Sequence, residues 1–162
     1  MKIAPRSIDS FVAAPPATLR AVLVYGPDSG LVRERGKMLM RAIVDDPDDP
    51  FRIAELTPAD LRDDPARLAD EAAAMALTGG RRVIGVRDAA DTLSGLFDDF
   101  LKAPIGDALV VVEAGNLGPR SKLRKTFEDS KESGAAIPCY ADEGRTLEDV
   151  IARTLGASGL RV

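Results

Sequence analysis

The chain reads Ala21-Val22-Leu23-Val24-Tyr25-Gly26-Pro27-Asp28-Ser29-Gly30-Leu31-Val32-Arg33 from its first apolar run into the segment that follows, and this stretch decides its fold class. The run Ala21–Tyr25 is continuously apolar, which is typical of a strand buried on both faces. From Gly30 to Ile43 the apolar positions recur at helical spacing, so this segment predicts an amphipathic helix. A buried strand, a glycine-containing turn and a helix in this order are the first unit of an α/β fold.

The same pattern repeats along the rest of the chain. It predicts five strands, at Ala21–Tyr25, Phe51–Leu56, Arg82–Arg87, Ala108–Glu113 and Ala136–Tyr140. It predicts further helices at Ser7–Ala13, Ala66–Met75, Thr92–Leu101, Ser121–Ser130 and Thr146–Leu155. Such alternation implies parallel strands joined by right-handed crossovers. We therefore expect an α/β protein, a three-layer αβα sandwich around a five-stranded, mainly parallel sheet of the RecA type.

Composition limits the possible functions. The chain has 162 residues, of which 45% are hydrophobic and 30% charged, which suits one soluble domain. Histidine is absent and Cys139 is the one cysteine, so the sequence excludes an internal disulfide and the commonest general base. We expect Cys139 to be an inert core residue. The short apolar runs and the opening Met1-Lys2-Ile3 predict no membrane span and no signal peptide, and hence a cytoplasmic protein.

The turn after the first strand lies where a phosphate-binding loop would read G-x-x-x-x-G-K-[ST]. Counting from Gly26, the last three positions hold Leu31, Val32 and Arg33, so the phosphate-binding lysine and the Mg²⁺-binding hydroxyl are both replaced. Arg87 follows the third strand where a metal-binding carboxylate would be expected. We predict no cofactor, no metal and no catalysis. A degenerate but active NTPase remains the alternative.

Charged segments offer weaker signals. The net charge of −4 disfavours a surface devoted to nucleic acid. The acidic runs at 45–49 and 60–64 are interpreted as solvated turns and helix caps, because they lack the glycine spacing of a calcium loop. Basic residues gather at one predicted helix start: Arg120, Lys122, Arg124 and Lys125. They could contact DNA or phosphate, although a solvated helix face is the favoured interpretation.

An apolar segment follows the predicted helix at 66–75. Met75 and Leu77 precede the two glycines that turn the chain toward the third strand. An apolar side chain at a helix end beside a flexible turn can fill a pocket of a partner protein. The residues alone favour a core position for Leu77 and leave partner binding open.

Several segments, in this order and spacing, resemble one family. They are Leu23-Val24-Tyr25-Gly26-Pro27-Asp28, Leu31-Val32-Arg33-Glu34, Ala76-Leu77-Thr78-Gly79-Gly80-Arg81-Arg82-Val83-Ile84, Leu109-Val110-Val111-Val112-Glu113-Ala114-Gly115-Asn116-Leu117, Ser121-Lys122-Leu123 and Ile137-Pro138-Cys139-Tyr140. Together they resemble the delta subunit of the bacterial DNA polymerase III clamp loader. The resemblance runs from about Ala21 to Val162.

The resemblance implies an AAA+-type domain that has lost its phosphate-binding loop and that binds and helps to open the sliding clamp, the beta subunit, during DNA replication. An apolar pair at a helix end would enter a pocket on the clamp. By position this pair falls on Leu77 and Thr78, with Met75 as an alternative second contact because Thr78 replaces a usually bulky apolar residue.

The resemblance also implies how the chain is organised. Residues 1–140 would form the RecA-like, clamp-binding domain, and residues 141–162 the start of a truncated helical lid. Further domains, absent here, would bind the other clamp-loader subunits, and DNA would be a partner of the full complex. A phosphate-binding or nucleic-acid-binding domain is the remaining alternative.

Overall fold

The computed structural model describes residues 1–46, 48–75 and 79–140. The strands are β1 (Ala21–Tyr25), β2 (Ile53–Leu56), β3 (Val83–Ala89), β4 (Leu109–Ala114) and β5 (Gly134–Pro138). The α-helices are α1 (Ile8–Ala13), α2 (Ser29–Ile43), α3 (Pro58–Asp63), α4 (Ala66–Ala73), α5 (Ser94–Lys102) and α6 (Lys122–Glu128), and 3-10 turns cover Pro5–Ser7 and Asp91–Leu93. The predicted helix at 146–155 and the predicted lid lie outside the described residues.

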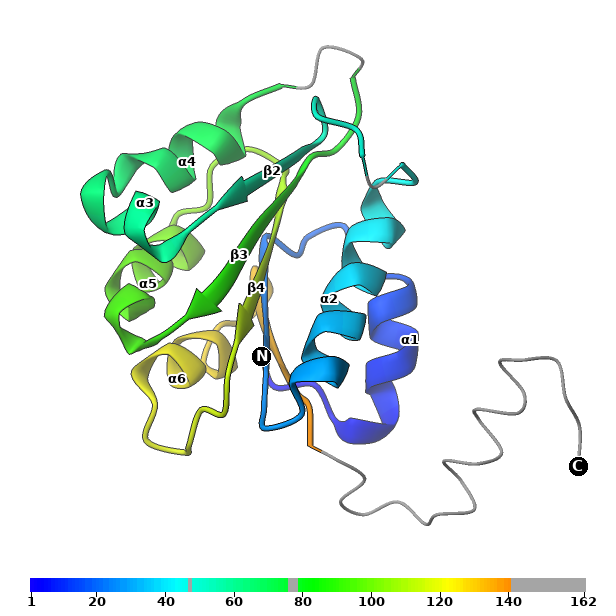
Figure 1. Ribbon diagram of the computed structural model, residues 1–162, viewed down its shortest axis with the longest axis vertical. Helices are drawn as coiled ribbons and strands as arrows, with labels where there is room; N and C mark the ends of the chain where they lie inside the picture. The colour runs from blue at the N-terminus through cyan, green and yellow to red at the C-terminus, as the bar shows by residue number, and fades with distance from the viewer. Residues whose placement is uncertain (47, 76–78, 141–162) are drawn as a thin grey trace, which may run out of the picture.

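All five strands are parallel and form one sheet in the order β2-β3-β4-β1-β5. Helices α3, α4, α5 and α6 cover one face, and α1 and α2 cover the other (Figure 1). Alternate residues of β1 pack into the apolar clusters on opposite faces of the sheet. Leu23 belongs to one cluster, while Val22 and Val24 belong to the other. The predicted αβα sandwich is confirmed.

The limits of β1 agree with the prediction, whereas those of β2, β3, β4 and β5 differ from it by one or two residues. β2 begins at Ile53 because the Asp49 carboxylate accepts a hydrogen bond from the Phe51 amide (2.9 Å) and holds residues 49–51 in a turn. β5 ends at Pro138, and Cys139 is buried just beyond it, as expected of a core thiol. Burial raises the pKa of this thiol.

One short helix was not predicted. Thr57 begins α3 with a capping box, since its hydroxyl accepts from the Asp60 amide and the Asp60 carboxylate accepts from the Thr57 amide. The acidic run that begins at Asp60 is therefore partly helical, and Asp60 takes part in a helix cap, as predicted for this run. Leu61 of this helix is buried beneath it.

The first residues of the chain extend the sheet at its β5 edge. Lys2 forms a parallel bridge with Ala136, and the Met1 ammonium group donates to the carbonyls of Phe127 and Gly134.

Within the described residues, no helix has both the length and the apolar character needed to cross a bilayer.

Candidate functional site

In the turn between β1 and α2, the backbone N–H groups of Gly26 and Asp28 donate to carbonyl groups of the protein itself. Gly26 has a positive φ of 144° and donates its amide to the Gly115 carbonyl (3.0 Å). The Asp28 amide points at the Cys139 carbonyl (3.4 Å), and the Asp28 side chain caps α2 by accepting from the Leu31 amide (3.0 Å). Three of the backbone amides at the place of a phosphate cradle, those of Gly26, Asp28 and Leu31, are thus engaged by protein acceptors.

An ion pair lies at the start of α2. Arg33, which stands at the hydroxyl position of the phosphate-loop pattern, donates to the Glu113 carboxylate at 3.0 Å. Glu113 comes from β4 and is 6% exposed, and its carboxylate lies so close to α2 that a Cβ on Gly36 would stand 2.7 Å from it. Burial raises the pKa of Glu113, and Arg33 partly offsets this effect by stabilising the charged form.

A small hollow of about 370 Å³ remains beside this pair. Arg33 and Arg87 line it, together with Asp88 and Glu113. In the part of the chain that the structure describes, no group of three or more histidine, cysteine, aspartate or glutamate residues could hold a metal ion. Arg33 and Arg87 stand at the sequence positions of the Mg²⁺-binding hydroxyl and of the metal-binding acid, and both line this hollow beside the carboxylates of Asp88 and Glu113.

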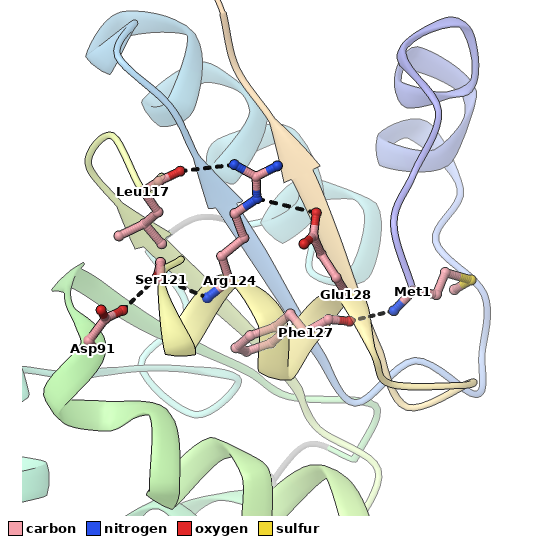
Figure 2. A network of polar contacts seen from close by, with 7 residues as sticks. All are labelled: Met1, Asp91, Leu117, Ser121, Arg124, Phe127 and Glu128. Atoms are coloured by element: carbon pink, nitrogen blue, oxygen red, sulfur yellow. Dashed lines mark hydrogen bonds and ion pairs between the residues drawn. The ribbon is translucent and has the colours of Figure 1, made fainter. Parts of the chain in front are cut away.

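The four basic residues singled out from the sequence do not form one stripe. Arg124 pairs with Glu128 (3.3 Å) and donates to the Leu117 carbonyl (3.1 Å) (Figure 2). Its guanidinium group also lies over the Tyr25 ring, 5.2 Å from the ring centroid. Burial raises the pKa of Tyr25 to about 12. Arg124 thus serves packing between α6 and β1.

The other three basic residues are exposed and diverge. Lys122 and Lys125 line a groove between α5 and α6, while Arg120 lines a separate hollow. A carboxylate of the protein itself lies at the start of α6. Asp91 accepts hydrogen bonds from the Ser121 hydroxyl (2.5 Å; Figure 2) and from the Leu123 amide (3.2 Å). These hydrogen bonds lower the pKa of Asp91, and the one from Ser121 has the largest effect.

The apolar candidate Met75 is 90% exposed, just beyond the last residue of α4. Its companions Leu77 and Thr78 lie outside the described residues. The end of α4 is at the edge of the sheet where the parallel strands begin, at the top of Figure 1.

Two arginines fasten the chain on either side of this segment. Arg82 donates to the Glu71 carbonyl (2.6 Å) and pairs with the Glu71 carboxylate (3.0 Å), so it ties the start of β3 to α4. Arg52 donates to the carbonyls of Arg81 (3.1 Å) and Ile43 (2.9 Å), so it ties the same strand start to the end of α2. Both ends of the segment that holds the predicted contacts are therefore anchored.

Sequence reasoning missed two exposed apolar residues at this edge. Phe51, which was assigned to a strand, is 47% exposed, and Ile105, in the loop before β4, is 48% exposed. The dipeptide Pro50-Phe51 after four aspartates was the available signal for Phe51, since a proline behind an acidic turn disfavours a central strand.

The fold resembles that of two solved bacterial proteins. The DNA clamp loader delta protein of Bacillus subtilis superposes with a TM-score of 0.59 at 18% identity, over 83% of this chain and 40% of that one. A DNA polymerase III gamma subunit-related protein of Thermotoga maritima gives 0.58 at 14% identity, over 91% of this chain and 49% of that one. The chain thus spans less than half the length of these proteins and shares their fold over the matched residues.

No family model matches the sequence. No curated protein matches it either.

Proposed function

We propose that this chain is the clamp-binding domain of a clamp-loader delta subunit, which binds the sliding clamp and helps to open it during DNA replication. The observation that carries the proposal is the exposed Met75 at the end of α4, on a segment anchored at both ends by Arg82 and Arg52. Leu77 and Thr78 follow on that segment and would enter the clamp pocket. The AAA+-like fold shared with clamp-loader proteins supports this assignment.

Ring opening would draw on binding energy. A subunit that binds an opened clamp more tightly than a closed one shifts the clamp toward the opened form without chemistry of its own. The chain would act as a part of the DNA polymerase III holoenzyme, while other subunits hydrolyse ATP. Contacts to those subunits would come from further domains, and DNA would be met in the full complex.

The direct test is a binding measurement with the sliding clamp of the same organism. We expect the two proteins to elute together from a sizing column and to give a saturable calorimetric titration. The heat capacity change of binding should be negative, because apolar surface is buried. Separate elution together with a flat titration at high micromolar concentration would reject the proposal.

A second measurement separates this proposal from an active NTPase. We expect no saturable binding of ATP with Mg²⁺, because the amides of Gly26, Asp28 and Leu31 are engaged by protein acceptors. In addition, Arg33 is paired with Glu113, and the phosphate-binding lysine is replaced. Titration of a fluorescent ATP analogue checks this, with an intact P-loop ATPase as the positive control. Micromolar affinity that depends on Mg²⁺ would favour the NTPase.

A nucleic-acid-binding domain is less well supported. Arg124 is held by Glu128 and Tyr25, and Asp91 occupies the amides at the start of α6. Lys122 and Lys125 remain as the candidate DNA contacts of the full complex.

A further inference from the structure

Three exposed apolar residues lie in loops at the edge where the strands begin: Phe51, Met75 and Ile105. Contacts of the backbone link these loops. Arg82 donates to the Phe51 carbonyl (3.2 Å) and to the Glu71 carbonyl of α4, whose last turn leads to Met75. A Cβ on Gly106 would stand 2.1 Å from the Ala72 carbonyl oxygen, so the loop of Ile105 also lies against the end of α4.

Phe51 is displayed on a fixed backbone. Its amide donates to the Asp49 carboxylate (2.9 Å) and its carbonyl accepts from Arg82 (3.2 Å), while the ring is 47% exposed. A large apolar ring on a backbone that is already ordered loses little conformational entropy when a partner covers it. Rings of this kind are frequent among the residues that dominate protein interfaces.

The loop that carries Phe51 is strongly acidic. Asp45, Asp46, Asp48 and Asp49 precede the ring, and none of them pairs with a cation among the described residues. Such a loop repels the phosphates of nucleic acid and attracts a protein surface with lysine or arginine side chains.

We infer that Phe51 and its acidic loop form a second contact with the protein that binds the Met75–Thr78 segment. On that partner, the contact surface would be apolar and flanked by basic side chains. This inference rests on the proposed function, since the partner is then the sliding clamp. Phe51 adds apolar contact area outside the main pocket, and the aspartates orient the clamp as it approaches. No motif of the sequence assigns this role to the loop.

The first test is Phe51→Ala, measured by calorimetry against the clamp. We expect affinity to fall about three- to tenfold, as for the covering of half a phenylalanine ring. Met38→Ala is the matched control, because Met38 is 37% exposed on α2, which covers the other face of the sheet from α4 (Figure 1), and should leave affinity unchanged.

The second test changes charge without touching the fold. The Asp45 and Asp48 carboxylates make no hydrogen bond to the described residues, so the double variant Asp45→Asn, Asp48→Asn should melt like the wild type. We expect slower association with the clamp and a weaker dependence of the association rate on salt. Glu34→Gln with Glu132→Gln, two exposed acids elsewhere, makes the same charge change and should keep the wild-type salt dependence.

The outcomes separate this inference from the function on which it rests. If Leu77→Ala weakens clamp binding while Phe51→Ala and the double Asn variant match their controls, the second contact is wrong and the proposed function stands. If the wild-type chain does not bind the clamp, both fall. Weaker binding by Phe51→Ala together with an altered salt dependence in the double Asn variant supports both.

Discussion

Gly26→Ala is expected to destabilise the domain by about 3 kcal/mol or more and to lower its melting temperature by about 6–12 °C. A Cβ on this residue would stand 2.1 Å from the Cys139 carbonyl oxygen, and its φ of 144° is unfavourable for any residue with a side chain. The obstacle is backbone, so it cannot rotate away. Thermal and urea unfolding followed by circular dichroism measure the effect.

Gly30→Ala is the matched control for this prediction. Gly30 lies four residues further on, inside α2, with the Asp28 carboxylate at 3.5 Å as its nearest contact. Alanine is the better helix former there, so this variant should be as stable as the wild type or slightly more so. Equal stability of the two variants would contradict the close contact between Gly26 and the end of β5.

Leu77→Ala is expected to weaken binding to the sliding clamp by about tenfold to a hundredfold, because burying a leucine in a partner pocket contributes ~1.5–3 kcal/mol. The melting temperature should stay near that of the wild type. A leucine of the domain's own core would instead cost ~2–5 kcal/mol of folding free energy when truncated. Calorimetric titration with the clamp and thermal unfolding of the same sample distinguish the two.

A strongly lowered melting temperature with unchanged clamp affinity in the folded fraction would remove Leu77 from the interface. The neighbouring position offers a gain-of-binding test. Thr78→Phe restores apolar bulk and should tighten the complex, and Met75→Ala should then have little effect. If Thr78→Phe changes nothing and Met75→Ala weakens binding, Met75 is the second contact.

Most of the sheet could be predicted from the sequence because β1, β4 and β5 are buried along their whole length, on both faces. β1 and β4 therefore appear as uninterrupted apolar runs, and each predicted range overlaps the observed strand. The helix α3 was missed because its apolar face consists of little more than Leu61, so its signal lies in the capping pair Thr57 and Asp60 and not in periodicity.

The candidate site was less predictable, for two physical reasons. The replacement of the phosphate-binding lysine is evident from a few consecutive residues of the sequence. The pairing of Arg33 with Glu113, in contrast, joins residues 80 positions apart and depends on the packing of α2 on the sheet. The exposure of Phe51 likewise depends on a turn held by the Asp49 side chain and on the guanidinium group of Arg82, just before β3. Long-range contacts of this kind leave no periodic signal.

The strand order has a consequence for how the chain is made. β1 is central in the sheet, yet its two neighbours, β4 and β5, are the last strands of the described residues. During synthesis the apolar residues of β1 leave the ribosome without their partners, and residue 109 must be translated before the first of these pairings can form. Because β1 must wait for such distant partners, folding should be slow relative to helical domains of this size. The exposed apolar strand is also a natural target for chaperones that shield nascent chains.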